Sequence, residues 1–427
     1  MKILILTIGS RGDVQPYVAL GQGLLQAGHA VTLCTGELFK EMVMAHGLAF
    51  APMDDEMIRL ADSPEARQMI EGGGNPLRAI NMVKPMIRRM LDDIWQAAQQ
   101  VQPDLIIYHP KTLGGYHVAE VLAVPVILSM VLPLVTPTRE FAIPLTTADL
   151  GGFLNRLSYK LVPMISAPYS SVINDFRQKL GLKPAGRLID ETRLPDGRPM
   201  PVMYGYSNHV LPRPADWPDT TVATGYWFLP PDETWQPPAD LCAFLQNGPP
   251  PIYVGFGSMA GTQPERLAAV AIGAVQKAGQ RGILATGWGG LQPGDLPDTI
   301  FKLESAPHDW LFPQTAAVVH HGGSGTTAAG LRAGKPSLIC PFMGDQPFWG
   351  ECVYQLGAGP KPIKQKKLTV EAMATAIEQM VHTPDMQQNV PAIGARLRAE
   401  DGIANAIHFV EKMARAPSTS GQENRTS

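Results

Sequence analysis

Cysteine is scarce in this chain, because its 427 residues include only four. These lie far apart and form no Cys-x-x-Cys pair: Cys34, Cys242, Cys340 and Cys352. Such usage argues against a zinc site with cysteine ligands and against a disulfide framework. It favours a reducing compartment, so we expect a cytoplasmic protein.

A long hydrophobic run is also missing. The longest largely apolar stretch, residues 121–135, contains Pro125, Ser129 and Pro133 and is too short to span a bilayer. The first residues reach Gly9 too early for a secretory signal, and no small-residue cleavage site follows. The sequence therefore predicts no stable membrane insertion.

An excess of one charge is absent too. The formal net charge is −3, and the densest group of lysines lies within residues 361–367. This balance gives no reason to expect a nucleic-acid partner. Hydrophobic residues make up 45% of the chain and charged residues 17%, as in a globular enzyme.

The most informative feature that is present is the run HHGGSGTT at residues 320–327. It follows the apolar residues 316–319 and precedes a helix-like stretch, so backbone N–H groups of a glycine-rich turn would face an anion. The loop contains no lysine and lacks the spacing of the ATPase phosphate loop. His321 and the threonine hydroxyls would add further donors.

A second polar loop, PFMGDQP at residues 341–347, follows another apolar run. It places Asp345 and Gln346, a carboxylate and an amide, close in sequence to the glycine-rich turn. A nucleotide-sugar requires both features, because its pyrophosphate needs donors and its sugar hydroxyls need acceptors. The two loops together predict a nucleotide-sugar site.

Short apolar runs alternate with helical patterns in both halves of the chain, which predicts an α/β protein with two doubly wound, Rossmann-like domains facing across a cleft. A proline-rich stretch at 211–251 divides them. We expect an N-terminal domain at 1–210 that binds the acceptor and a C-terminal domain at 252–416 that binds the donor. The polar tail at 417–427 is expected to be disordered.

The motifs resemble those of family 1 glycosyltransferases, and the sterol 3-beta-glucosyltransferase branch in particular. The resemblance rests on residues 9–17 (GSRGDVQPY), 254–259 (VGFGSM), 309–312 (DWLF) and 320–357, in the order of the family and across most of the chain. It implies the GT-B fold and the transfer of a hexose from a UDP-sugar with inverted stereochemistry. It also implies that no metal and no cofactor other than this donor substrate are needed.

Asp13 is the candidate general base in this resemblance, because the sterol branch uses an aspartate at this place to take the proton of the acceptor hydroxyl. From position alone, Asp13 is equally interpreted as a helix N-cap, and the two roles are compatible. The resemblance also assigns His117 to assist Asp13 or orient the acceptor. Ser10 and Arg11 of the same loop join the donor site.

The remaining donor contacts also follow from the resemblance. Asp345 and Gln346 would bond the sugar hydroxyls, and Ser305 stands where plant members carry a tryptophan that stacks on uracil. The base and the diphosphate would contact the following residues: Ser258, His308, Trp310, His321, Gly323, Ser324, Gly325 and Thr326.

Apolar residues of the N-terminal half are candidates for the acceptor wall. Met82, Met86 and Met90 are spaced four apart with Pro85 expected in the first helical turn, a pattern that fits core packing or an adaptable wall. Trp95, residues 130–134, Phe141 and Ile143 would add to it. We expect a hydrophobic alcohol such as a sterol as acceptor, with glucose as the sugar.

Alternatives remain at this point. A polyketide, flavonoid or glycolipid acceptor with a UDP- or TDP-sugar would fit the same motifs. A sugar-nucleotide binder without catalysis is disfavoured by Asp13, and an NAD-dependent oxidoreductase is disfavoured because Gly-x-Gly-x-x-Gly is missing.

Overall fold

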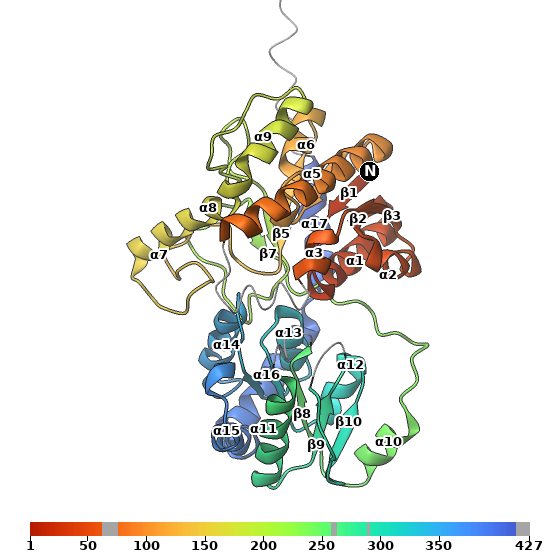
Figure 1. Cartoon of the computed structure of the whole chain (residues 1–427), viewed down its shortest axis with the longest axis vertical. Helices are drawn as coiled ribbons and strands as arrows, with labels where there is room; N and C mark the ends of the chain where they lie inside the picture. The colour runs from red at the N-terminus through yellow and green to blue at the C-terminus, as the bar shows by residue number, and fades with distance from the viewer. Residues whose placement is uncertain (62–75, 258–262, 288–290, 416–427) are drawn as a thin grey trace, which may run out of the picture.

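The computed structural model describes residues 1–61, 76–257, 263–287 and 291–415. In these residues, two separate parallel sheets each form the centre of a domain (Figure 1). This arrangement confirms the predicted α/β class with two doubly wound domains. The two domains stack along the long axis of the molecule.

The N-terminal sheet has the strand order β3-β2-β1-β4-β5-β6-β7, and every pairing is parallel. The order reverses at β1, where β2 pairs on one side and β4 on the other. Loops that leave β1 and β4 therefore meet at one edge of the sheet. The strands are β1 (Lys2–Leu6), β2 (Ala30–Gly36), β3 (Ala49–Met53), β4 (Leu105–Tyr108), β5 (Val126–Met130), β6 (Val202–Tyr204) and β7 (Thr221–Ala223).

Alternate side chains of β1 bury in two different cores. Ile3 and Ile5 pack with α1, whereas Leu4 and Leu6 pack with α5 on the other face. A strand covered on both faces reads as a continuous apolar run. The helices of this domain are α1 (Arg11–Gln26), α2 (Lys40–Ala45), α3 (Glu56–Ala61), α5 (Pro76–Val101), α6 (Gly115–Leu122), α7 (Gly152–Ser158), α8 (Val162–Ser166) and α9 (Ser170–Lys179). Short 3-10 turns are η1 (Glu37–Phe39), η2 (Pro110–Thr112), η3 (Tyr159–Leu161) and η4 (Ala167–Tyr169).

The C-terminal sheet is also parallel, with the order β10-β9-β8-β11-β12. Its strands are β8 (Ile252–Gly255), β9 (Gly282–Ala285), β10 (Ile300–Leu303), β11 (Ala317–His320) and β12 (Ser337–Ile339). They are accompanied by α10 (Ala239–Gln246), α11 (Pro264–Lys277), α12 (His308–Leu311), η6 (Phe312–Gln314), α13 (Ser324–Arg332), α14 (Gln346–Gln355), η7 (Gln365–Lys367), α15 (Val370–His382) and α16 (Pro384–Ala399).

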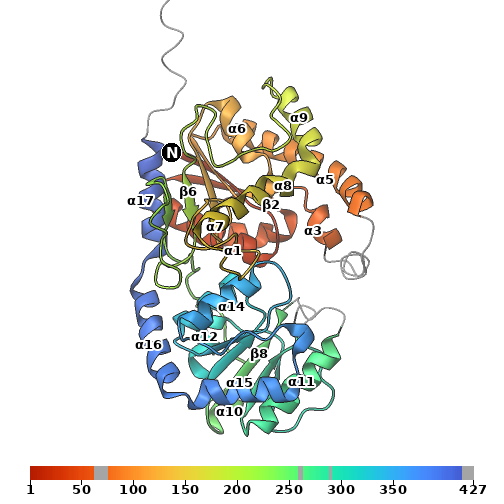
Figure 2. The ribbon, with the colours of Figure 1, turned by 90° about the vertical axis from the view of Figure 1, so that its left-hand side faces the viewer.

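The last helix, α17 (Gly402–Ala414), leaves the C-terminal sheet and packs on the N-terminal domain (Figure 2). Ala406, Phe409 and Val410 are buried in the core that contains Ile3 and Tyr17. The range 252–416 therefore does not behave as one structural unit. Likewise the expected linker at 211–251 contains β7 of the N-terminal sheet and α10, whose Leu241 is buried against the C-terminal domain.

The methionine pattern at residues 82–90 is mainly a core pattern. Met86 and Met90 are buried on α5, while Met82 is exposed. Pro85 lies inside α5, which begins at Pro76, so its expected place in the first turn is wrong. Of the two interpretations of these methionines, core packing therefore holds for Met86 and Met90.

Candidate functional site

The loop between β1 and α1 holds Asp13 in a fixed position. Ser10 caps the helix, and Asp13 is the third residue of α1, so the interpretation of Asp13 as the N-cap itself is wrong. The Oδ2 atom of Asp13 accepts hydrogen bonds from the Ser10 backbone N–H at 2.9 Å and from the Ser10 hydroxyl at 3.1 Å. This reciprocal arrangement is a capping box, which stabilises the start of the helix.

Gly9 allows this loop to close around the carboxylate. Its φ is +143°, and a Cβ atom at this position would lie 2.2 Å from the Asp13 Oδ2 atom. Only glycine combines this backbone conformation with the required space. Gly9 is therefore needed for the position that the Asp13 carboxylate takes in this loop.

Two residues that the sequence interpretation missed complete this setting. The Lys111 ammonium donates to the Oδ1 atom of Asp13 at 2.6 Å. The Lys111 backbone N–H donates to Nδ1 of His109 at 3.1 Å, so the neutral His109 ring carries its proton on Nε2. Both residues follow β4, which pairs with β1, and adjacent parallel strands deliver their following loops to one edge. That register is the signal that could have found them.

The local charges keep Asp13 ionised. Burial acts to raise the pKa of Asp13, but the positive charge and hydrogen bond of Lys111, together with the Ser10 backbone bond, hold the pKa below its ordinary value. Burial and the nearby Lys111 charge lower the pKa of His109 to about 3, so its ring is neutral near pH 7. The carboxylate thus faces one cation and one neutral imidazole.

His117 lies in a different cluster, and its predicted partnership with Asp13 is not seen. It is fully buried on α6, where its Nδ1 atom contacts Nη1 of Arg177 at 2.8 Å. Arg177 also donates to Glu120 at 2.6 Å. Burial and the charge of Arg177 lower the pKa of His117 to about 3. These contacts tie α6 to α9, and the Nε2 atom of His117 is buried without a hydrogen-bond partner.

The glycine-rich turn joins β11 to α13 as predicted. Gly323 is the extended N-cap of α13, and no side chain caps it, so the first N–H groups of the helix at Ser324, Gly325 and Thr326 remain open to an anion. A Cβ atom on Gly323 would lie 2.6 Å from Nε2 of His321. The imidazole of His321 therefore lies directly beside this helix start.

His321 has an unused polar atom at this position. Its Nδ1 atom is buried without a hydrogen-bond partner, and burial lowers the pKa of His321 to about 4. A buried polar atom without a partner is costly, so its retention here points to a ligand. Thr327, by contrast, uses its hydroxyl within the helix, donating to the Gly323 carbonyl at 3.0 Å.

The neighbouring histidine has a different environment. His320 is fully buried, and its Nδ1 atom accepts from the Gly322 backbone N–H at 3.1 Å. Burial places the pKa of His320 well below its ordinary value. His320 therefore shapes the turn, and His321 remains the one of the pair that lies beside the helix start.

The base-reading candidates lie on α12. His308 stacks on Phe312 with ring centroids 4.3 Å apart, and Trp310 packs edge-on against Trp235 at 5.0 Å. Burial, followed by the charges of His321 and of Arg11, lowers the pKa of His308 to about 4. The predicted place of Arg11 in the donor site remains a prediction.

Asp345 and Gln346 begin α14. The Asp345 Oδ2 atom accepts from the Trp349 indole N–H at 3.0 Å, which orients the carboxylate. The Gln346 Oε1 atom accepts from the backbone N–H groups of Phe342 at 2.7 Å and Met343 at 3.2 Å. The Oε1 atom of Gln346 is therefore already hydrogen-bonded within the loop. Its amide NH2 group remains available to donate a hydrogen bond to a ligand.

The helix that follows Asp345 contacts the N-terminal domain. Burial first, and then the negative charge of Asp13, raise the pKa of Asp345, so the two carboxylates are within electrostatic reach of one another. Direct ring contacts cross the boundary beside them: Phe141 with Phe348 at 5.8 Å, and Tyr206 with Trp349 at 5.9 Å. Phe141, predicted for the acceptor wall, therefore borders the donor domain.

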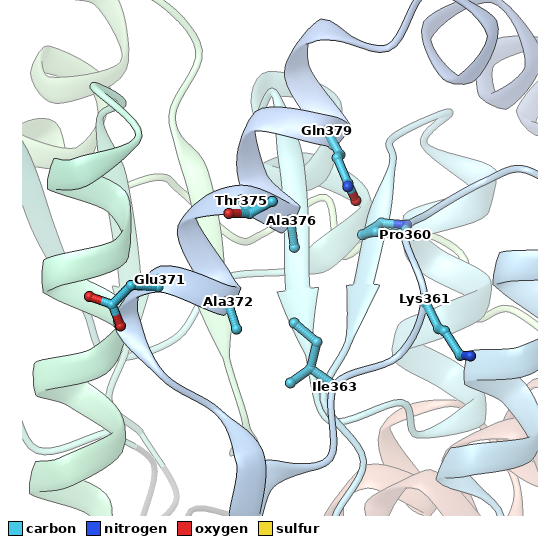
Figure 3. A pocket seen from close by; sticks show the side chains of 8 residues that line it. All are labelled: Pro360, Lys361, Ile363, Glu371, Ala372, Thr375, Ala376 and Gln379. Atoms are coloured by element: carbon cyan, nitrogen blue, oxygen red, sulfur yellow. The ribbon is translucent and has the colours of Figure 1, made fainter.

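Three further observations complete the site. Ser258 lies outside the described residues. In the described part of the chain, no group of three or more His, Cys, Asp or Glu side chains is placed to hold a metal ion. A hollow of about 350 Å³ is lined by residues of α15 and by Pro360, Lys361 and Ile363, and none of the predicted site residues lines it. Figure 3 shows the side chains that line this hollow.

Comparison with known proteins agrees with this geometry. Residues 3–141 match the glycosyltransferase family 28 N-terminal domain, and residues 290–405 match the C-terminal domain of erythromycin biosynthesis protein CIII-like proteins. A sterol 3-beta-glucosyltransferase of Arabidopsis thaliana is 37% identical over 419 residues, which cover 95% of this chain and 67% of that protein. The chain belongs to the glycosyltransferase family that contains this sterol 3-beta-glucosyltransferase. The predicted resemblance is confirmed.

A second relative is much longer than this chain. A sterol 3-beta-glucosyltransferase of Aspergillus clavatus is 38% identical over 435 residues, which cover 96% of this chain but 29% of that protein. The chain therefore spans two thirds of the plant protein and less than a third of the fungal one.

Solved structures share the fold of this glycosyltransferase. The kitacinnamycin glycosyltransferase superposes with a TM-score of 0.73 at 17% identity, covering 96% of this chain and 98% of that one. The calicheamicin glycosyltransferase gives a TM-score of 0.69 at 18% identity, covering 97% and 98%. A spinosyn rhamnosyltransferase solved with thymidine diphosphate gives 0.65 at 17% identity, covering 96% and 100%. These neighbours confirm the predicted GT-B fold.

Proposed function

We propose that this glycosyltransferase moves a hexose, glucose in the first instance, from a UDP-sugar to the hydroxyl of a sterol or a similar rigid alcohol. The observation that carries the proposal is the uncapped start of α13 beside His321 in one domain, together with the Asp13–Lys111 pair in the first loop of the other domain. The sterol 3-beta-glucosyltransferases of plants and fungi support the choice of sugar and acceptor.

Asp13 acts as the general base in this proposal. Its carboxylate has about four lone-pair positions, and three are used by Ser10 and Lys111. One position remains for the acceptor hydroxyl, whose proton passes to Asp13 as the oxygen attacks the anomeric carbon. The role of assisting Asp13, which the sequence assigned to His117, passes in this proposal to His109, whose neutral ring lies near Asp13.

The start of α13 stabilises the departing UDP. Its free N–H groups and the partial positive charge of the helix dipole face the diphosphate, and His321 adds one side-chain donor. Protein donors then balance the charge that develops on the leaving group, so the reaction needs no metal ion. Attack by the acceptor from the side of Asp13, opposite this leaving group, inverts the anomeric carbon.

Lys111 sets the basicity of Asp13. The ammonium keeps the carboxylate ionised near neutral pH, because it lowers the pKa of Asp13 against the effect of burial. The side chain of Lys111 is half exposed, so it can move aside when an acceptor fills the space in front of the carboxylate. Removal of that cation raises the basicity of Asp13 at the moment of proton transfer.

The decisive experiment measures both products. Purified enzyme is incubated with UDP-glucose and a sterol, and UDP release and the sterol glucoside are quantified by mass spectrometry. The proposal predicts one glucoside per UDP released and a β-linkage when the donor is an α-linked UDP-glucose. UDP release without glucoside from any sterol, polyketide or phenol would contradict it. The free thiols of the four cysteines fit the predicted cytoplasmic location of this reaction.

A further inference from the structure

The segment from α7 to α8 has its apolar side facing outward. Seven large apolar side chains of this segment are exposed, and Phe153 is 77% exposed. They are Leu150, Phe153, Leu154, Leu157, Leu161, Met164 and Ile165. We call these seven side chains the outer apolar face. Monomeric soluble proteins rarely collect so many exposed apolar side chains in one short stretch.

The uncharged polar side chains of the same segment are buried or partly buried in the protein. Asn155 is buried and bonds through its amide to the Arg139 carbonyl at 3.1 Å and to Asp149 at 2.8 Å. The Ser158 hydroxyl accepts from the Ile143 backbone N–H at 2.8 Å, and Tyr159 is buried. A surface helix normally buries its apolar stripe and exposes its polar one. Here the pattern is inverted, and the hydrogen bonds fix it in that orientation.

The charge of the segment has one sign. Between Asp149 and Asp175 the chain contains no acidic residue, whereas Arg156 and Lys160 are both exposed. Arg156 approaches Asp216 at 3.8 Å, and no ion pair of Lys160 is found among the described residues. Exposed apolar side chains accompanied by cations are the pattern that lies in the headgroup region of an anionic bilayer.

The position of the segment also fits a membrane surface. Figure 1 shows α7 and α8 projecting from one side of the N-terminal domain, away from both sheets. The same loop that ties Ile143 to Ser158 carries Phe141, which contacts Phe348 at the domain boundary. The outer apolar face is therefore joined by one short loop to the place where donor and acceptor meet.

We propose that the outer apolar face docks this glycosyltransferase on the surface of an anionic lipid bilayer. The docked enzyme would take a lipid-dissolved alcohol directly from the bilayer into the acceptor side of the site. Docking of this kind lies on the membrane and requires no spanning helix; in the described part of the chain, no helix is both long and apolar enough to span one. The link to the acceptor rests on the proposed function, whereas the docking itself does not.

The test uses the whole enzyme and vesicles that contain no sterol. Vesicles of phosphatidylcholine with phosphatidylserine are sedimented with the wild type, with the double variant Phe153→Ser/Ile165→Ser, and with Lys160→Glu. We expect the wild type to bind these vesicles and to bind phosphatidylcholine alone more weakly. The double variant should lose at least tenfold in partitioning, and Lys160→Glu should lose more than the roughly fivefold expected for one removed cation.

The matched control is Leu38→Ser/Met44→Ser, which removes two exposed apolar side chains elsewhere on the same domain. It should bind vesicles like the wild type, and thermal melting should show all variants folded. Equal vesicle binding by the wild type and both outer-face variants would overturn the docking proposal. A wild-type dimer in sedimentation analysis that Phe153→Ser/Ile165→Ser converts to a monomer would also overturn it, because a second copy would then cover the face.

Kinetics separate this proposal from the proposed function. Outer-face variants should lose turnover of a sterol held in vesicles and keep turnover of a water-soluble phenolic acceptor. Equal losses for both acceptors would mean that the face lines the acceptor site, and docking would be rejected. Vesicle binding without any sterol transfer would leave the docking intact and reject the proposed acceptor.

Discussion

Replacement of Lys111 by methionine tests the ion pair that sets the basicity of Asp13. Methionine keeps a long apolar side chain and removes the ammonium, which lies 2.6 Å from the Asp13 Oδ1 atom. Because a cation lowers the pKa of a nearby carboxyl, its loss should raise the pKa of Asp13. The acidic limb of the pH profile of kcat/KM, which reports the free enzyme's base, should then move to higher pH.

The size of this shift follows from the exposure of the pair. The Lys111 side chain is 51% exposed and that of Asp13 is 20% exposed, so solvent screens their attraction. Two unit charges roughly 4 Å apart attract by about 1 kcal/mol in water. Since one pKa unit corresponds to about 1.4 kcal/mol, the limb should move by about 0.7 pH unit. High salt should reduce the difference between the two enzymes.

The assay is UDP release across the acidic pH range, with saturating donor and limiting acceptor. Lys111→Arg keeps the charge and should leave the limb near its wild-type position. Lys40→Met is the matched control, because Lys40 forms an exposed ion pair with Glu37 at 2.8 Å elsewhere on the same domain. An unmoved limb in a folded Lys111→Met enzyme would refute the reasoning, because the titrating base would then not be the carboxylate beside Lys111.

Three further outcomes are expected. His321→Ala should weaken UDP binding roughly 10- to 100-fold in calorimetry, since a hydrogen bond to a charged group contributes about 1.5–3 kcal/mol; unchanged affinity would remove His321 from the donor site. Asp345→Ala should reduce use of UDP-glucose far more than binding of free UDP, and equal losses would reject its contact with the sugar. His117 titrates at about 3 in the fold, below its ordinary 6.5, so it stabilises the fold above pH 6.5 and this stability is lost as pH falls toward 3. In urea unfolding, His117→Gln should therefore reduce the slope of this acid-side loss of stability by up to about 1.4 kcal/mol per pH unit, and an unchanged slope would contradict this expectation.

The sheets were predictable because their strands are continuous apolar runs. Residues 3–6 and 105–108 are buried on both faces of the sheet. Such strands consist of uninterrupted apolar or aromatic residues, here Ile, Leu and Tyr, and are therefore recognisable in the sequence. Short edge strands carry a weaker signal. β7 lies in a proline-rich stretch that reads as a linker, and its place is decided by pairing with β6, a tertiary contact.

The donor loop was predictable in position and partly in detail. Its glycines and His321 form a local pattern, so the turn with an uncapped helix start follows from neighbouring residues. The Oε1 atom of Gln346 accepts hydrogen bonds from two backbone N–H groups of its own loop. No local sequence pattern predicts these two bonds.

The surroundings of Asp13 depended on contacts between distant segments. Lys111 lies 98 positions away along the chain and reaches Asp13 only because β1 and β4 are neighbours in the sheet. His117 follows the same strand and was chosen by resemblance, but the turn of α6 carries it to Arg177 instead. In the same way, α17 packs on α1 through buried apolar side chains that lie far apart in the sequence, so no local pattern predicts this contact.

The most direct test of the account is the turnover of Asp13→Asn. Asparagine keeps the shape of the side chain and can still accept from Ser10, but it cannot take a proton at neutral pH. The account predicts a loss of kcat on the order of 10²–10⁴ with UDP affinity almost unchanged and the thermal melting temperature close to that of the wild type. Near-normal turnover by this folded variant would contradict the central claim and leave Asp13 only its part in the capping box.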